Sequence, residues 1–444
     1  MNIRLPRGLR AASGVLCAAG VALAVLLHGD GAAAPAPPPP ALPAPLPATA
    51  PATTATPARP AQLDADYAPL PGRRPTVREM AAVGRAMFFD RGLSASGQLA
   101  CASCHSPQHA YGPPDGRAVQ LGGRDGRSPG LRAVPSLRYL QTVPAFTEHF
   151  YDNDGNDSED AGPTGGRTWD GRASSAHAQA RLPLLSPFEM ANASPAEVVA
   201  RLRRAPYAAQ FRAAFGEQAL DDEALAFRRA LMALEVFQET PSEFAPFTSK
   251  YDAVLRGQAR LSPQELRGLA AFNDPARGNC ASCHISDVRG GQFPLFTDFG
   301  LIALGAPRNK EIPANADPAW RDQGLCGPLR EDLKDHPEYC GLFRTPSLRN
   351  AATRRVFFHN GAFHSLEAVL RFYAQRDVRP ERFYPRASDG RVAKFDDLPA
   401  AQHGNVNTDA PFGGQPGDKP MLSESDIRDV IAFLRTLNDG WKRP

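Results

Sequence analysis

Four of the seven cysteines lie in two identical five-residue words, which carry the clearest chemistry in this 444-residue sequence. The first word is Cys101-Ala-Ser-Cys104-His105, and the second word is Cys280-Ala-Ser-Cys283-His284. Two thiols at this spacing, followed directly by a histidine, are typical of c-type haem attachment. The thiols add to the porphyrin vinyl groups and the imidazole becomes the proximal iron ligand. The words therefore predict two covalently bound haem c groups, with His105 and His284 on the irons.

Two other uses of paired cysteines fit the sequence less well. A thioredoxin-like dithiol would follow a strand in a βαβ unit, and no such pattern surrounds either word. A four-cysteine zinc site would have to bring together pairs that are far apart in the chain, and it would leave both histidines without a role. Haem attachment uses all six residues.

The elements that must position the words are helices, which are marked by their caps. Thr76 and Glu79 form a capping box at the start of a helical pattern that runs into the first word, and Ser262 and Glu265 repeat the device before the second. Strand-like alternation is scarce, and loops rich in Gly and Pro join the helices. We therefore predict a mostly α fold made of two cytochrome c-like domains, each with one covalently attached haem c, joined by long loops.

Composition divides the chain into four segments. Residues 1–34 combine basic residues, an apolar stretch and small residues, as a signal peptide does, and an uncleaved N-terminal anchor is the alternative. Residues 35–62 are rich in Pro and Ala and predict a disordered linker. We place an N-terminal haem domain at 63–243 and a C-terminal haem domain at 244–444.

Charge and cysteine usage bear on the compartment and the partners. A net charge of +3 gives none of the concentrated basic charge of a nucleic-acid-binding protein. Haem attachment to cysteine occurs outside the cytoplasm, which agrees with the leader. We expect a periplasmic protein, tethered to the inner membrane if the leader is retained. Cys326 and Cys340 are then an even pair in an oxidising compartment, which favours a disulfide.

Several ordered motifs resemble those of the bacterial diheme cytochrome c peroxidase and MauG superfamily, over about residues 77–437. They are Met87-Phe-Phe-Asp90 with Leu93-Ser-Ala-Ser96, Trp169-Asp-Gly-Arg172-Ala-Ser-Ser, Pro187-Phe-Glu189-Met190, Phe343-Arg-Thr-Pro-Ser-Leu-Arg-Asn350 and Phe358-His359-Asn360-Gly361. The resemblance implies that the haem at the first word is peroxidatic, with an open distal position. The haem at the second word would be a six-coordinate electron-transfer haem.

The resemblance also implies roles for individual side chains near the first haem. Trp169 would lie between the haems and couple them electronically; the alternative is a packed core residue. Glu189 falls where the family has its distal carboxylate, which moves the peroxide proton, and Gln179 and Pro183 fall on neighbouring distal-pocket positions. Without the surrounding motif, Glu189 would be read as a solvated surface charge.

At the second haem, the family places its sixth ligand fourteen residues after the histidine of the Phe-His-x-Gly motif. Counting from His359 gives Tyr373, where classical peroxidases have Met and MauG-type enzymes have Tyr. Met421, which follows the second word, lies outside that motif. A phenolate oxygen stabilises ferric and higher-valent iron. The alternative for Tyr373 is a core aromatic in an apolar helical stretch.

Calcium is the less certain cofactor. The family commonly joins its domains with a calcium ion held by an Asn side chain and by backbone carbonyls of a Thr-x-Pro stretch. This chain has Ala133 at the Asn position, and Arg354 and Val356 in the stretch before Phe358. The acidic segment 152–160 lacks the twelve-residue pattern of a calcium loop.

The resemblance implies an exported oxidoreductase that reduces hydrogen peroxide. Its electrons would come from a small redox protein, a cytochrome c or a cupredoxin, or in MauG-like fashion from a protein substrate through high-valent haem. The alternative from a different class is a non-catalytic diheme cytochrome that only relays electrons. That alternative predicts two six-coordinate haems and no use for Glu189.

Overall fold

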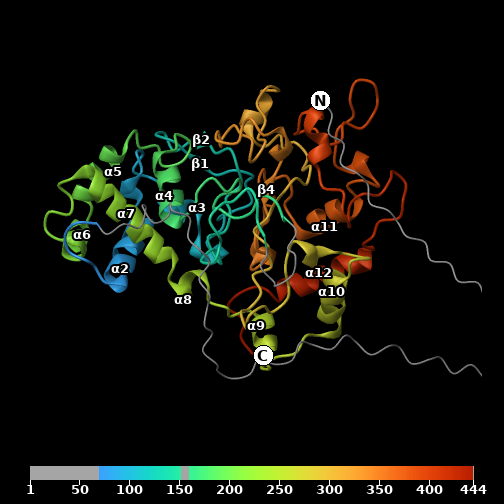
Figure 1. Cartoon of the computed structure of the whole chain (residues 1–444), viewed down its shortest axis with the longest axis horizontal. Coiled ribbons are helices and arrows are strands. Elements are labelled where there is room, and N and C mark those ends of the chain that lie inside the picture. Colours follow the sequence, from blue (N-terminus) through green and yellow to red (C-terminus); the bar gives the residue numbers. More distant parts are fainter. Residues whose placement is uncertain (1–69, 152–159, 444) are drawn as a thin grey trace, which may run out of the picture. The chain divides into compact units, whose positions relative to one another are not determined.

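The computed structural model describes residues 70–151 and 160–443, in which helices are the main regular structure (Figure 1). The helices are α2 (Val77–Phe88), α3 (Cys101–Cys104), α4 (Ala176–Leu185), α5 (Pro195–Arg204), α6 (Ala208–Phe215), α7 (Glu223–Gln238), α8 (Pro241–Phe244), α9 (Lys250–Leu255), α10 (Pro263–Asn273), α11 (Leu366–Gln375) and α12 (Glu424–Arg435). Two short antiparallel sheets pair β1 (Leu121–Gly122) with β2 (Ser128–Pro129) and β3 (Leu301–Ile302) with β4 (Phe343–Arg344). The prediction of a mostly α fold is confirmed.

Three segments singled out in the sequence lie wholly or mostly outside the described residues. They are the predicted leader or anchor (1–34), the predicted linker (35–62) and the acidic segment (152–160). Within residues 70–151 and 160–443, the helices are all too short or too polar to span a membrane.

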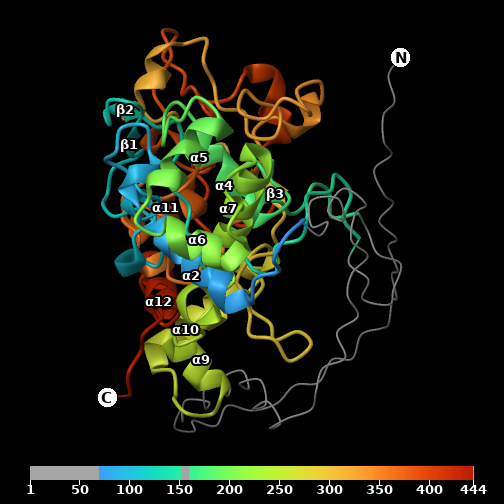
Figure 2. The same cartoon turned by 90° about the vertical axis from the view of Figure 1, so that its left-hand side faces the viewer.

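The helix before the first word, α2, packs along α7 (Figures 1 and 2). Its start is the predicted capping box: the Glu79 N–H donates to the Thr76 hydroxyl, and the Thr76 N–H donates to the Glu79 carboxylate. Gly84 lets the two helices meet closely. A Cβ atom at this position would lie 1.9 Å from the Ala233 carbonyl oxygen and 2.9 Å from the Phe237 Cβ.

The helix before the second word, α10, packs along α12 in the same way (Figures 1 and 2). Ser262 and Glu265 form its capping box, as the sequence predicts. A Cβ atom at Gly268 would lie 2.0 Å from the Asp429 carbonyl oxygen and 2.9 Å from the Phe433 Cβ. In both halves, the helix that precedes the cysteine word therefore packs closely against a second helix at a glycine.

The buried apolar side chains form two main clusters. One draws its members from residues 83–244 together with Phe299, and the other from residues 251–437. Along the chain the change falls between Phe244 and Tyr251, close to the border predicted at 243 and 244, and Phe299 from the second half joins the first cluster. The two domains themselves stay a prediction.

The segments that follow the words repeat as well. Residues 134–138 (Val-Pro-Ser-Leu-Arg) correspond to residues 345–349 (Thr-Pro-Ser-Leu-Arg). Residues 167–173 and 357–363 each form a loop closed by an antiparallel bridge between their ends, and each loop leads to a serine that caps a helix, α4 or α11. In this second repeat Trp169 corresponds to His359.

Two backbone hydrogen bonds join these repeats crosswise. The Arg344 N–H donates to the Trp169 carbonyl oxygen at 2.8 Å, and the Ala133 N–H donates to the His359 carbonyl oxygen at 2.7 Å. Ala133 and Arg344 hold corresponding positions, as do Trp169 and His359. The internal repeat therefore relates the two hydrogen bonds to each other, and each half of the chain supplies one donor and one acceptor.

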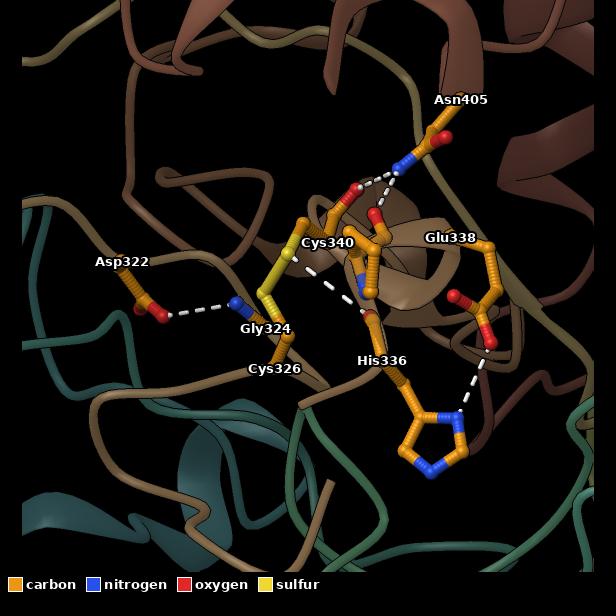
Figure 3. Close-up of a disulfide and its surroundings, with 8 residues drawn as sticks. Asp322, Gly324, Cys326, His336, Glu338, Cys340 and Asn405 are labelled. Atoms are coloured by element: carbon orange, nitrogen blue, oxygen red, sulfur yellow. Dashed lines mark hydrogen bonds and ion pairs between the residues drawn. A yellow bond between two sulfur atoms is a disulfide. The ribbon is translucent and has the colours of Figure 1, made fainter. Parts of the chain in front are cut away.

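Cys326 and Cys340 form the disulfide that the sequence favours (Figure 3). Both cysteines are buried. The Asn405 side-chain amide donates to the carbonyl oxygens of Pro337 at 2.7 Å and Cys340 at 3.0 Å. Beside the disulfide, the Gly324 N–H donates to the Asp322 carboxylate. The disulfide closes the loop 326–340, and Asp322, just before this loop, lines one of the cavities described next.

Candidate functional site

Each cysteine word borders an open cavity. The first cavity, of about 1940 Å³, is lined by Cys101, Cys104 and His105 of the first word. The second cavity, of about 1500 Å³, is lined by all the corresponding residues of the second word. None of the four thiols is in a disulfide. Because the words border different cavities, they do not converge as a shared zinc site would require.

The two histidines that the sequence predicts as proximal ligands, His105 and His284, are held alike. The Nδ1 atom of His105 lies 3.0 Å from the Tyr111 carbonyl oxygen, and that of His284 lies 2.9 Å from the Phe296 carbonyl oxygen. A proton donated from Nδ1 leaves the Nε2 lone pair free for a metal. Burial lowers the pKa of His105 to about 4 and also lowers the pKa of His284. Both rings are therefore neutral at neutral pH, as iron ligation requires.

The thiols have the opposite electrostatics from a redox dithiol. Burial raises the pKa of Cys101, Cys104 and Cys280 to about 12, and it raises the pKa of Cys283 too. A catalytic dithiol needs a lowered thiol pKa. The thioredoxin-like alternative therefore does not fit these sites, whereas thioether bonds to a haem do.

The predicted distal residues Glu189, Gln179 and Pro183 all line the first cavity with His105. Gln179 and Pro183 lie on α4, and Glu189 lies in the turn that follows. That turn rests on β1: the Gly123 N–H donates to the Glu189 carbonyl oxygen at 2.8 Å. The sequence-predicted distal set is thus brought together on one cavity.

Glu189 has the electrostatics of a proton-transfer group. The residue is exposed to the open space of the first cavity, while protein atoms around its carboxyl group raise its pKa by desolvation. A hydrogen bond with Ser186 and the charge of Arg172 act in the opposite direction. A carboxylate whose pKa is raised is a stronger base than an ordinary glutamate, which suits a group that accepts a proton and returns it.

Tyr373 lines the second cavity from α11. Its ring lies among Phe358, Phe372 and Phe412, at centroid distances of 6.2, 6.3 and 5.1 Å. Burial raises the phenol pKa, and the nearby thiols of Cys283 and Cys280 add to the effect. Met421 does not line this cavity, which leaves Tyr373 as the better placed of the two side chains for an iron.

The internal repeat relates the two distal positions. Pro183 follows Trp169 by the same fourteen residues by which Tyr373 follows His359, and the two lie on corresponding helices, α4 and α11. Proline has no side-chain atom that can bind iron, whereas a phenol oxygen can. The position that offers a sixth ligand in the second cavity therefore offers none in the first.

Trp169 lines both cavities. The residue is 8% exposed, and its indole N–H donates to the Ala133 carbonyl oxygen at 2.7 Å. Trp169 is thus a packed residue that also borders both cavities. A role in coupling the haems is therefore compatible with the alternative of a packed core residue.

The calcium site that the resemblance implies does not fit this chain. The Arg354 side chain donates through Nη2 to the Val134 carbonyl oxygen at 2.9 Å and through Nε to the Val356 carbonyl oxygen at 3.2 Å. The resemblance assigns backbone carbonyls of this stretch to calcium, and the Val356 carbonyl oxygen is already bound by Arg354. Burial lowers the pKa of Arg354 to about 10, so the guanidinium remains charged at neutral pH. A cation supplied by the chain therefore joins segments of the two halves.

Sequence reasoning missed Arg344, noted Arg354 only as part of the altered calcium stretch, and left His359 outside the iron sites without giving it another role. Arg344 lines both cavities and His359 lines the second. Aligning residues 134–138 with 345–349 would have drawn attention to Arg344, because it stands where the first half has Ala133.

Comparison with known proteins agrees with this geometry. The family described as di-haem cytochrome c peroxidase matches residues 78–260. The methylamine utilization protein MauG of Paracoccus denitrificans is 35% identical over 387 residues, which are 84% of this chain and 91% of that protein. The cytochrome c peroxidase Ccp of Escherichia coli is 25% identical over 377 residues, 83% of this chain and 60% of that protein.

A solved structure is similar over most of its length. The diheme peroxidase BthA from Burkholderia thailandensis aligns with a TM-score of 0.73 and 38% identity, covering 83% of this chain and 87% of that chain. This chain therefore belongs to the family of di-haem cytochrome c peroxidases and MauG proteins, and it is a diheme peroxidase-type oxidoreductase that carries two haem c groups.

Proposed function

We propose that this chain is an exported enzyme that reduces hydrogen peroxide at the haem of the first word, while the haem of the second word exchanges electrons with it. The observation that carries the proposal is the difference between Pro183 and Tyr373 at corresponding positions. Pro183 would offer no ligand to an iron in the first cavity, which would leave room for peroxide, and Tyr373 would be the residue that holds the iron in the second cavity.

Glu189 moves the proton in the first cavity. The bound haem supplies the two electrons that break the oxygen–oxygen bond. Glu189 accepts the proton of the peroxide oxygen nearer the iron and returns it to the far oxygen, which leaves as water. Gln179, on the same cavity, offers an amide that orients the peroxide.

Trp169 and Tyr373 act in electron transfer. Trp169, which borders both cavities, lies on the route between the two haems. The oxygen of Tyr373 is a hard donor that favours ferric and higher-valent iron over ferrous iron. The second haem is thereby suited to hold an oxidising equivalent, as a MauG-type enzyme needs.

The electron source is a small redox protein, a cytochrome c or a cupredoxin, or else the side chains of a protein substrate. The similarity to MauG of Paracoccus denitrificans favours the protein substrate. Haem attachment through cysteines, with a leader at 1–34, supports a periplasmic location and allows an inner-membrane tether.

Rapid mixing of the ferric holoprotein with hydrogen peroxide tests the proposal against a diheme cytochrome that only relays electrons. The enzyme gives a fast change in the haem absorption spectrum that reverses when a donor is added, and EPR shows one high-spin and one low-spin ferric haem beforehand. Two low-spin haems and no reaction with peroxide would establish the relay.

A further inference from the structure

Two buried polar atoms near the haem cavities have no use in the proposed reaction. Arg344 and His359 are 5% and 8% exposed, and the Arg344 Nη1 and His359 Nε2 atoms have no hydrogen-bond partner. Both residues line the second cavity, and Arg344 also lines the first. A buried donor without an acceptor costs about 1–3 kcal/mol, and more when it is charged. This cost indicates that a bound group supplies the acceptors.

Arg344 is held in place by the crosswise contact between the repeats. Its backbone N–H donates to the Trp169 carbonyl oxygen, and its Nε donates to the Thr168 carbonyl oxygen at 3.2 Å. Its backbone also pairs with Leu301 of β3. The guanidinium is therefore fixed at Nε, while Nη1 remains available for a further acceptor.

The charge of Arg344 is uncompensated. Arg132, which lines the first cavity, is bonded to the carboxylates of Asp170 and Asp322, but in residues 70–151 and 160–443 no carboxylate pairs with Arg344. Burial lowers the pKa of Arg344 to about 10, and the charge of Arg167 acts in the same direction. The side chain still carries its proton at neutral pH, so a buried positive charge stands at the border of both cavities.

His359 offers a neutral donor. Its ring stacks on Phe343 with a centroid distance of 3.4 Å and an interplanar angle of 6°. Burial lowers its pKa to about 3, so the imidazole is uncharged and one ring nitrogen carries a proton that it can donate. Phe343 and Arg344 are adjacent on β4. Because His359 stacks on Phe343, the two side chains with an unpaired donor lie beside the same strand.

The haem brings acceptors of matching charge. Thioether bonds at Cys280 and Cys283 fix the vinyl edge of the porphyrin, and its two propionate carboxylates project from the opposite edge. Carboxylates are the preferred partners of a guanidinium, and the pairing is strongest where water is excluded. We propose that Arg344 and His359 bind the propionates of the second haem. Arg344 thereby sets the electrostatic potential beside Trp169.

This inference rests on the two haem c groups and not on peroxide turnover. A cation paired with a propionate favours the ferrous haem, because it offsets the carboxylate charge near the iron. The pairing also keeps the propionate ionised, so the propionate itself adds no pH dependence to the reduction potential of the second haem in the neutral range. Asp397 lines the same cavity and burial raises its pKa to about 6, so its titration is common to the wild type and the variants. Without Arg344 the propionate takes up a proton more readily, and reduction becomes coupled to protonation.

Spectroelectrochemistry of the holoprotein and its Arg344→Gln variant tests the proposal. We expect the second haem of the variant to be harder to reduce by about tenfold in the equilibrium constant, which is about 59 mV for a one-electron couple. We also expect its potential to fall more steeply with rising pH than that of the wild type, in which Asp397 titrates as well. Arg344→Lys keeps the charge and restores the wild-type pH dependence.

Arg229→Gln is the matched control. Arg229 is 6% exposed and donates to the carbonyl oxygens of Ala219 and Pro71, but it borders neither cavity. Its loss removes a buried guanidinium and leaves both haem potentials unchanged. Should Arg344→Gln fail to fold, His359→Phe provides a second test through the same pH dependence.

Unchanged potentials and pH dependence in Arg344→Gln, with both haems attached, would overturn the proposal, as would an unaltered His359→Phe. The same potentials are measured without peroxide. A wild-type protein that is inert toward peroxide would therefore sink the proposed function and leave this inference standing.

Discussion

The two haem sites are built alike up to the iron and differ beyond it. Each has a capped helix with a glycine contact, at Gly84 or Gly268, an identical cysteine word, and a proximal histidine held through Nδ1 by a backbone carbonyl. These features attach and orient a haem, and they impose no reaction on it. The internal repeat therefore specifies haem binding and leaves the chemistry to the distal side.

The distal sides differ at corresponding positions. Pro183 with the nearby carboxyl group of Glu189 faces the first cavity, and Tyr373 faces the second. Trp169 and His359 are a second unequal pair: an indole shared by both cavities corresponds to an imidazole at the second alone. In the proposed function, these few side chains on a duplicated frame separate peroxide chemistry from electron transfer.

The largest expected effect comes from a substitution of Glu189, which removes one difference between the two distal sides. Glu189→Gln keeps the size of the side chain but removes the base, so the rate constant for the reaction with peroxide falls by about 10²–10⁴-fold, while both haems remain attached. Because desolvation raises the pKa of Glu189 and the ionised form is the base, the wild-type rate rises with pH through that pKa. Stopped-flow absorption across pH measures both effects.

Glu239→Gln is the control for that variant. Burial also raises the pKa of Glu239, but the residue does not line the first cavity. Its peroxide rate and pH profile should equal those of the wild type. A Glu189→Gln protein that keeps both the wild-type rate and its acid limb would show that Glu189 is not the base.

The next effect concerns Tyr373. Tyr373→Phe removes the oxygen ligand, so the low-spin EPR signal of the second haem changes and its reduction potential rises by about 100 mV or more, within the ~0.8 V span that axial ligands cover. Tyr384→Phe is the control, because this buried tyrosine donates to the Gly305 carbonyl oxygen and does not line the cavity. Identical spectra for Tyr373→Phe and wild type would reject ligation.

Much of this comparison could be predicted from local sequence. The cysteine words, the capping boxes and the fourteen-residue count to Tyr373 depend on residues close together in the chain, and motif spacing expresses them directly. The contacts of Arg344 and Arg354 could not be predicted in that way, because their partners, Trp169 and Val134, lie far away in the chain. Long-range backbone carbonyls leave no trace in side-chain identity, so the calcium question needed coordinates.

A smaller effect tests whether the glycine helix contacts of the two halves contribute equally to stability. Gly84→Ala and Gly268→Ala each place a methyl group about 2 Å from a carbonyl oxygen of the facing helix, so each should lower the free energy of unfolding by about 1–3 kcal/mol. Gly404→Ala, with no atom within 4 Å of the added Cβ, should have little effect. Denaturant unfolding of the holoprotein compares the three, and a large difference between the first two would show that the packing units are not equivalent.

The smallest effect concerns Arg354, which joins segments of the two halves. Since the Arg354 guanidinium already binds the Val134 and Val356 carbonyl oxygens, calcium chelation should leave the haem spectra and the peroxide reaction of the wild type unchanged. Arg354→Met leaves those carbonyls unpaired, which costs about 1–3 kcal/mol for each buried group, whereas the same change at the exposed neighbour Arg355 costs little. The low-spin and high-spin EPR signals measured with and without a chelator decide the matter. A wild-type spectrum that shifts on chelation, and returns when calcium is restored, would mean that a metal ion joins the halves in addition to Arg354.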